Sequence, residues 1–233
     1  MSDVLTHLRE GILTVSGRLV DASNATLFAQ CDFNGEVIDV IYKPIAGERP
    51  LWDFPDGNLA HREFAAYLVS SLSQWNVVPP TVLRDGPFGR GMVQQWIDID
   101  ESIDLALFYR EDHALLRVMA LFDAVINNTD RKIGHLLPAK NSHLFGCDHG
   151  VTFHEEDKLR TVLWQWAGMK LSESELLQLR NLIVSIEESR SEFMELITVA
   201  EIKALQSRIE RLINEGAFPH PSEDWPAVPW PPF

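Results

Sequence analysis

The pattern of apolar and polar positions changes along the chain. Up to about residue 96, short β-branched or alternating stretches predict strands at residues 12–20, 26–31, 36–43, 81–84 and 91–97. Asn34-Gly35, between the second and third stretch, is a dipeptide typical of a two-residue hairpin turn. Residues 59–69 carry apolar side chains at helical spacing and predict one helix among these strands.

From about residue 103 the pattern becomes helical. Residues 112–127 have apolar side chains at three- and four-residue steps and predict a long helix, and residues 158–166 predict a shorter one. Ser172-x-x-Glu175 and Thr198-x-x-Glu201 are capping boxes that mark two further helix starts. Short strands are expected at residues 133–137 and 143–147, and the Pro/Trp-rich residues 219–233 contain too many prolines for a helix or a central strand.

These elements predict an α+β fold with two lobes in a single domain. The β-rich N-lobe is expected at about residues 1–96 and the helical C-lobe at about 97–218, followed by the tail at 219–233. This order of elements is that of a protein-kinase-like fold.

Two loops after the long helix carry the candidate chemistry. Asp130 is followed five residues later by the polar residue His135, and Asp148 is followed by His149-Gly150. Kinases use an aspartate, a polar residue five positions on and a second Asp-x-Gly to place a phosphoryl acceptor and hold metal. Two carboxylates in loops that flank short apolar strands are also hard to explain by packing alone.

A lysine and a glutamate occur where such a site needs them. Lys43 ends the predicted strand 36–43, and Glu63 lies inside the predicted helix 59–69. Either residue alone is most simply a solvated surface charge. Four charged residues in the right order and on the right element types favour phosphoryl transfer.

Composition limits the possible partners. The chain has 233 residues, a formal net charge of −14 and a pI near 4.9, which argues against general nucleic-acid binding and against docking on an anionic membrane. Cys31 and Cys147 lack metal-type spacing and are expected to be free thiols. The N-terminus lacks a signal-peptide pattern and Arg117 and Asp123 interrupt the longest apolar stretch, so a soluble cytoplasmic protein without a transmembrane segment is expected.

Several segments resemble the phosphatidylinositol 3-/4-kinase-like superfamily, especially the type II 4-kinases and a small bacterial branch. The resemblance covers residues 40–166 and is carried by the following stretches: Val40-Ile41-Tyr42-Lys43-Pro44, His61-Arg62-Glu63-Phe64, Val78-Pro79-Pro80-Thr81, Met92-Val93-Gln94-Gln95-Trp96-Ile97, Phe122-Asp123-Ala124-Val125-Ile126-Asn127-Asn128-Thr129-Asp130-Arg131 and Asp148-His149-Gly150.

The resemblance implies a role for each matching residue. Lys43 would contact the nucleotide phosphates and Glu63 would orient it. Gln95, Trp96 and Ile97 would form the hinge that receives the adenine. Asp130 would position the acceptor hydroxyl or take its proton, and Asp148 would bind the metal that bridges the phosphates. The cofactor implied is ATP with Mg²⁺ or Mn²⁺.

The chain departs from the family pattern at three places. No Gly-x-Gly-x-x-Gly is present, so residues 21–25 would cover the phosphates with hydroxyl and backbone donors. His135 stands where a metal-binding Asn is expected, and imidazole suits Mn²⁺ better than Mg²⁺. The cysteine cluster through which eukaryotic type II enzymes are lipid-anchored is absent.

Three functions follow from these observations. The leading one is ATP-dependent transfer of the γ-phosphoryl group to a hydroxyl, with a protein, a soluble metabolite or an inositol lipid as acceptor. The alternatives are a nucleotide-binding pseudokinase or regulatory module, which His135 favours, and a nucleotidyl transferase on the same scaffold. Trp52 and Phe54, in a Pro-flanked loop, either pack on the N-lobe, or cover the nucleotide or bind a partner.

Overall fold

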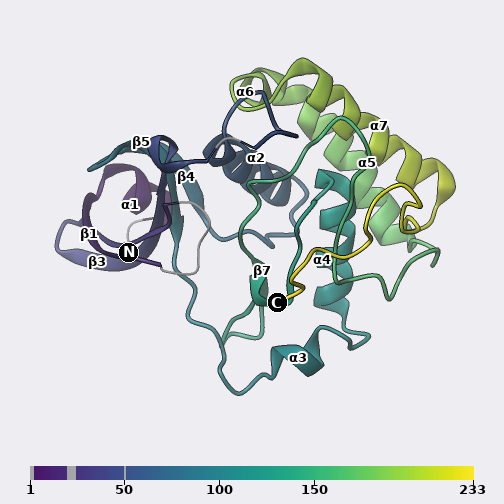
Figure 1. Cartoon of the computed structure of the whole chain (residues 1–233), viewed down its shortest axis with the longest axis horizontal. Helices are drawn as coiled ribbons and strands as arrows, with labels where there is room; N and C mark the ends of the chain where they lie inside the picture. The colour runs from purple at the N-terminus through teal and green to yellow at the C-terminus, as the bar shows by residue number, and fades with distance from the viewer. Residues whose placement is uncertain (1–2, 20–24, 50) are drawn as a thin grey trace.

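A five-stranded antiparallel sheet forms the N-terminal part of the computed structural model, which describes residues 3–19, 25–49 and 51–233. The strand order is β1-β2-β3-β5-β4, and α1 lies against the sheet (Figure 1). The elements are α1 (Val4–Glu10), β1 (Ile12–Arg18), β2 (Leu27–Phe33), β3 (Glu36–Pro44), η1 (Ile45–Gly47), α2 (Leu59–Leu72), β4 (Thr81–Gly86) and β5 (Gly89–Gln95).

The C-terminal part is built mainly from helices, and α2 packs with it. The elements are α3 (Leu105–Phe108), α4 (Ala114–Ile126), η2 (Ile133–His135), the hairpin β6 (Leu136–Pro138) and β7 (Leu144–Gly146), α5 (Glu173–Glu188), α6 (Arg190–Met194) and α7 (Val199–Glu215). Buried residues of α2, α4, α5 and α7 share the larger hydrophobic core, whereas the sheet and α1 enclose a smaller one. The α+β order of a β-rich region followed by a helical region is as predicted from the sequence.

Turn chemistry fixes the register of the strand that ends in Lys43. Asn34 and Gly35 both have positive φ, 56° and 83°, which is the backbone of a type I′ turn. The turn pairs β2 with β3 so that Leu27 lies opposite Tyr42, and β3 then pairs with β5 with Lys43 opposite Met92. Lys43 therefore sits at a defined position at the end of a central strand.

The long apolar helix ends where the Asp130 loop begins. Leu116, Met119, Phe122 and Val125 of α4 are fully buried, which agrees with their spacing in the sequence. Asn127 caps the helix in the left-handed conformation, with φ 53° and ψ 55°. The chain therefore turns away at residue 127 and enters the loop.

The two predicted capping boxes are confirmed at the starts of α5 and α7. Ser172 and Glu175 exchange side-chain and backbone hydrogen bonds, and so do Thr198 and Glu201. The prediction of a helix at residues 158–166 was wrong. These residues are extended or in turns, since the Arg131 backbone pairs with this segment on both sides of Thr161.

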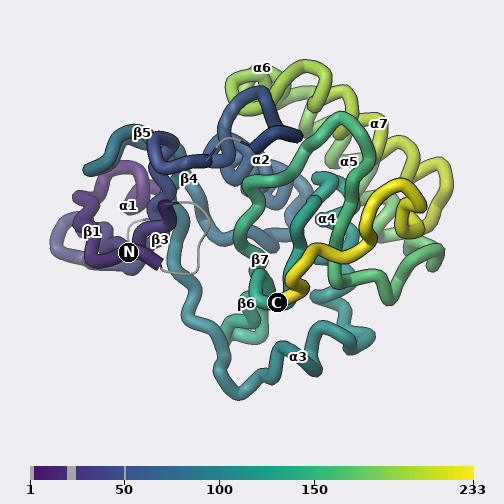
Figure 2. Tube along the Cα trace, in the orientation of Figure 1, coloured from purple at the N-terminus to yellow at the C-terminus, as the bar shows by residue number. Residues whose placement is uncertain are grey.

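The C-terminal tail runs back across the helical part and ends beside the β6–β7 hairpin (Figure 2). The Ala227 carbonyl accepts hydrogen bonds from the Thr161 backbone N–H at 3.1 Å and from the Trp164 indole at 2.8 Å. Near the end of the tail, the Ile133 backbone N–H donates to the Pro232 carbonyl at 2.8 Å. Across the described ranges, no helix is both long and apolar enough to cross a lipid bilayer.

Candidate active site

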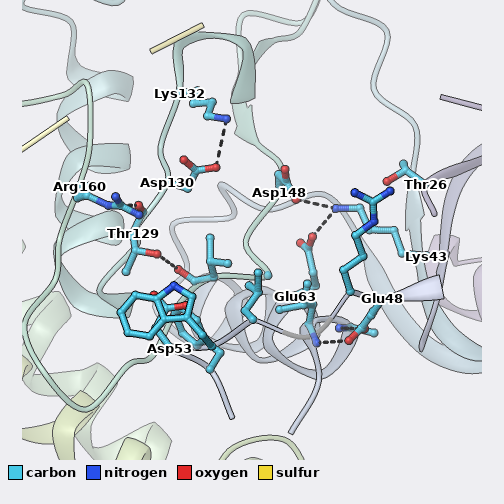
Figure 3. A pocket seen from close by; sticks show the side chains of 18 of the residues that line it. Thr26, Lys43, Glu48, Asp53, Glu63, Thr129, Asp130, Lys132, Asp148 and Arg160 are labelled. Carbon is cyan, nitrogen blue, oxygen red and sulfur yellow. Dashed lines mark hydrogen bonds and ion pairs between the residues drawn. The ribbon is translucent and has the colours of Figure 1, made fainter. Parts of the chain in front are cut away.

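Lys43 lies between two carboxylates that come from different parts of the fold (Figure 3). Its ammonium donates to Glu63 Oε1 of α2 at 2.5 Å and to Asp148 Oδ1, in the loop after β7, at 2.9 Å. The second oxygen of Glu63 accepts the His149 backbone N–H at 2.9 Å. Glu63 is almost fully buried, but 54% of the Asp148 side chain is exposed. Asp148 can therefore face a ligand while it pairs with Lys43.

Lys43 and Asp148 hold each other in the ionised form. Burial alone would lower the pKa of Lys43, but Asp148 and Glu63 outweigh it and hold this pKa above its usual range. The Lys43 ammonium in turn holds the pKa of Asp148 well below its usual range. At neutral pH the site thus presents an ammonium and an exposed carboxylate side by side.

Asp130 reaches the same cavity from the loop after α4. The side chain of Asn128 accepts its backbone N–H at 3.0 Å, and Lys132 Nζ lies 3.4 Å from Asp130 Oδ2. Burial raises the pKa of Asp130, and the nearby ammonium of Lys132 opposes that shift. A carboxylate with a raised pKa is a better proton acceptor than one in bulk water.

His135 lies next to Asp148 and outside the lining of the cavity described below. Its Nε2 is 3.6 Å from Asp148 Oδ2, and its Nδ1 accepts the Lys132 backbone N–H over a long 3.4 Å. Burial lowers the pKa of His135 to about 4, so the ring is neutral at pH 7. An imidazole whose Nδ1 accepts a hydrogen bond carries its proton on Nε2.

A fully buried ionic network, which the sequence did not reveal, supports both loops. Arg131 donates Nε and Nη2 to the Asp123 carboxylate, and neither side chain is exposed. The same guanidinium donates to the Cys147 carbonyl at 3.2 Å and to His149 Nε2 at 2.6 Å. Asp123, one of two charged residues in an otherwise apolar helix, was the signal available in the sequence. Arg131 thereby ties the Asp130 loop to the Asp148 loop.

A cavity of about 520 Å³ opens in front of these residues. Lys43, Glu63, Asp130 and Asp148 are among its lining residues, together with Thr26, Asp53, Lys132, Lys158 and Arg160 and the aromatic residues Trp52, Phe54, Trp225 and Trp230. The four charged residues singled out in the sequence thus meet at one cavity, which is the size of ordinary small-molecule sites. His135 and the three predicted hinge residues do not line it.

The predicted hinge residues lie at the end of β5, with Gln95 as its last residue and Trp96 and Ile97 directly after it. The Gln95 backbone N–H donates to the Pro80 carbonyl at 2.9 Å and that of Trp96 to the Asp39 carbonyl at 3.0 Å. The Trp96 ring packs edge-on against Phe28 at 5.2 Å between centroids. Two of the three hinge N–H groups are therefore engaged within the fold, and Ile97 is the residue whose backbone N–H has no partner in the described part of the chain.

Trp52 and Phe54 have different environments in the structure. Phe54 is buried under the Arg62 guanidinium at 4.8 Å and packs edge-on against His154. Trp52 is 84% exposed at the edge of the cavity. Packing therefore explains one of the two aromatic residues and leaves the other facing solvent.

No cluster of three or more His, Cys, Asp and Glu side chains in the described residues could hold a metal ion alone. The exposed carboxylate of Asp148 nevertheless fits Mg²⁺, which proteins usually bind through one or two carboxylates together with substrate phosphates. The stretch 21–24, expected to cover the phosphates, lies outside the described residues. Ala25 and Thr26, which follow it, line the cavity.

The fold is of the kinase-like class. Two crystal structures of the Golgi casein kinase, one with Mn/ADP bound, match with TM-scores of 0.57 and 0.59 at 14% identity. These matches cover 91% of this chain and 73% and 74% of theirs. The Helicobacter pylori proinflammatory kinase CtkA matches with a TM-score of 0.43 at 10% identity and covers 90% of this chain and 94% of its own. The two Golgi casein kinase matches confirm the predicted two-lobed kinase-like fold.

The family follows from a much closer relative. Protein Rv2133c of Mycobacterium tuberculosis is 38% identical over 262 residues, an alignment that covers 97% of this chain and 94% of that protein. The chain belongs to the family of Protein Rv2133c. No protein-family model matches it. The more specific assignment to the phosphatidylinositol 3-/4-kinase-like superfamily stays a prediction.

Proposed function

We propose that the protein is an ATP-dependent phosphotransferase of the phosphatidylinositol 3-/4-kinase-like superfamily. It would transfer the γ-phosphoryl group of ATP to a hydroxyl. The observation that carries this proposal is the Lys43 ammonium held between Glu63 and Asp148, at 2.5 and 2.9 Å, in the wall of a cavity that Asp130 also lines. Phosphoryl transfer needs positioning and charge neutralisation, and these four residues supply both.

The nucleotide is proposed to lie with its phosphates against Lys43. Glu63 fixes the direction of the ammonium, because its two oxygens are held by Lys43 and by the His149 N–H. Gln95, Trp96 and Ile97 would receive the adenine. Of these three, Ile97 is the residue whose backbone N–H would bond it, since the other two N–H groups already have partners.

A divalent ion is proposed at Asp148, whose Oδ1 accepts from Lys43 and whose Oδ2 lies 3.6 Å from His135 Nε2, because 54% of this side chain is exposed at the cavity. When bound there with ATP, it would neutralise charge on the phosphates. The His135 imidazole is uncharged at neutral pH, and as a nitrogen ligand it suits Mn²⁺. Its Nε2 could bind metal once the proton has moved to Nδ1, at the cost of the long contact from Lys132.

Asp130 is proposed to direct the acceptor. It accepts the proton of the attacking hydroxyl as the oxygen of that hydroxyl bonds to the γ-phosphorus. The bond from the γ-phosphorus to the β–γ bridging oxygen breaks, and ADP leaves. Burial of Asp130, which raises its pKa, suits this role.

Substitutions separate the roles of Asp130 and Lys43. In Asp130→Asn we expect turnover to be lost and nucleotide affinity to be kept, because the amide cannot take the proton. In Lys43→Ala both should fall. Asp98 is exposed and does not line the cavity, so Asp98→Asn is the matched control and should behave as wild type. Unchanged turnover in Asp130→Asn would exclude this mechanism.

His135 at a metal position favours a second function, a nucleotide-binding regulatory module, and a nucleotidyl transferase on the same scaffold is the third. The purified protein can be incubated with ATP labelled at the γ- or the α-phosphate, in Mg²⁺ or Mn²⁺. Incorporation of γ-label supports the kinase and incorporation of α-label the nucleotidyl transferase. Nucleotide binding without either supports the regulatory module.

Within this proposal residues 1–96 and 97–218 are the two lobes of one domain, and the protein acts in the cytoplasm.

A further inference from the structure

Two tryptophans at the cavity are exposed to an extent that packing does not explain. Trp52 is 84% and Trp230 89% exposed, more than any other large hydrophobic side chain in the described residues. Both line the cavity that holds Asp130, and so does the half-buried Trp225. Exposed aromatic groups gathered around a concave site are typical of ligand-binding surfaces.

The tail that carries Trp225 and Trp230 is attached to the fold on both sides of Trp230. Ala227, between them, is bonded to Thr161 and Trp164, and Pro232, after them, is bonded to Ile133. Ile133 lies three residues after Asp130 in the same loop. The tail therefore forms one wall of the cavity and is hydrogen-bonded to the segment that carries Asp130, the residue proposed to direct the acceptor.

The polar groups in this wall favour a neutral ligand with hydroxyl groups. Asp53 follows Trp52 directly, lines the cavity and has no hydrogen-bond or ion-pair partner among the described residues. Figure 3 shows Asp53 on the same side of the cavity as Thr129 and Arg160. A carboxylate without a partner accepts hydrogen bonds well and repels anions.

The cations in the wall are already engaged. Lys132 pairs with Asp130 at 3.4 Å, and Lys158 pairs with Glu156 at 3.2 Å and lies 4.5 Å from the centre of the Trp225 ring. Arg160 donates Nε to the Thr129 carbonyl at 2.7 Å. Lys132 and Lys158 are therefore each paired with a carboxylate, and Asp53 adds a further negative charge to this wall, which favours a neutral ligand.

We propose that Trp52, Asp53 and the tail residues Trp225 and Trp230 form the acceptor subsite, and that it takes a sugar or cyclic polyol. Such a molecule has an apolar face of C–H groups, which packs on an indole ring, and hydroxyls at its edge, which donate to carboxylates. The cavity of about 520 Å³ has room for a small ring beside the phosphates.

This inference rests on the proposed function for the direction of transfer. One ring hydroxyl attacks the γ-phosphorus of ATP and gives its proton to Asp130. The bond to the β–γ bridging oxygen breaks, and the products are the sugar or polyol phosphate and ADP.

Binding can be tested without turnover. Titration calorimetry, with ADP and Mg²⁺ or Mn²⁺ present, would use a panel of monosaccharides, disaccharides and cyclic polyols that includes glucose, N-acetylglucosamine and myo-inositol. We expect at least one member to bind with millimolar or lower Kd. Trp52→Ala and Trp230→Ala should each raise that Kd about tenfold and leave the nucleotide Kd unchanged. Phe88 is 57% exposed and does not line the cavity, so Phe88→Ala is the matched control.

A second arm measures γ-label transfer to the same panel, to casein and to phosphatidylinositol vesicles. Sugar or polyol binding without transfer supports the subsite and counts against the proposed kinase. Transfer to casein or to vesicles, with no panel member bound, supports the kinase and overturns the subsite. Two further results overturn it, namely no binding in the panel and tryptophan variants that bind like the wild type.

Discussion

The buried pair of Arg131 and Asp123 gives the sharpest test of how the two site loops are held. Asp123→Asn keeps the shape of the side chain and removes its charge. The carboxylate accepts from four donors, namely Arg131 Nε, Arg131 Nη2, the Asn128 side-chain amide and the Thr161 hydroxyl, and this set of interactions is then altered. The guanidinium stays in place with no exposed surface and no anion beside it.

The size of the effect follows from this burial. Breaking a fully buried ion pair by removing one partner costs about 3–5 kcal/mol, because the remaining charge is left uncompensated. The Asn side chain can still accept a hydrogen bond, so we expect the lower end, about 3 kcal/mol. With a urea m-value of about 2–3 kcal/mol/M, the unfolding midpoint should fall by about 1–1.5 M.

The assay is urea unfolding followed by tryptophan fluorescence and by far-ultraviolet circular dichroism. Glu187→Gln removes one partner of the solvent-exposed pair with Arg190 and should leave the midpoint unchanged. The double variant Asp123→Leu/Arg131→Met, which leaves no buried charge, should be more stable than Asp123→Asn. A loss below about 1 kcal/mol in Asp123→Asn would refute the reasoning, since the pair would then be no stronger than a surface pair.

Two further predictions concern histidines. Burial lowers the pKa of His61, His135 and His149 in the folded protein, so the unfolded chain takes up more protons below pH 6.5 and the free energy of unfolding should fall between pH 7 and pH 5. For His135, whose pKa in the folded protein is about 4, the free energy of unfolding lost at pH 5 is on the order of 2 kcal/mol. This loss is measurable as a lower Tm with chelator present. A Tm that does not change between pH 7 and pH 5 would contradict the prediction. In His135→Asn an amide oxygen replaces the imidazole, and the ratio of Mg²⁺-supported to Mn²⁺-supported turnover should rise; an unchanged ratio would mean that His135 does not contact the metal.

The parts of the candidate site that were predictable from the sequence lie at the ends of regular elements. Lys43 ends a strand whose register depends on the Asn34-Gly35 turn, and Glu63 lies inside a helix with clear periodicity. Asp130 follows a helix whose buried face is apolar except for Asp123. Period and turn chemistry are local properties, so they were sufficient to place these residues on their elements.

The segment at residues 158–166 shows where local reasoning failed. The segment is not helical, because the Arg131 N–H donates to the Arg160 carbonyl at 3.1 Å and the Val162 N–H to the Arg131 carbonyl at 3.2 Å. These bonds join residues about thirty positions apart, and no window of the sequence contains both partners. The helix α1 was missed for a related reason, since its buried residues His7 and Leu8 pack against the sheet.

The side of the site proposed to bind the acceptor was the least predictable, and its construction explains why. Trp52 stands in an irregular loop, and Trp230 in a tail that folds back over more than sixty residues to bond with Trp164 and Thr161. Their positions depend on long-range contacts, whereas the phosphate-side residues depend on strands and helices. Loops and termini also accept sequence change more readily than the elements they join. A kinase-like scaffold can therefore keep its phosphate side and change its acceptor by altering these two segments, which makes the tryptophan variants a more direct route to the acceptor than any variant of Lys43 or Asp148.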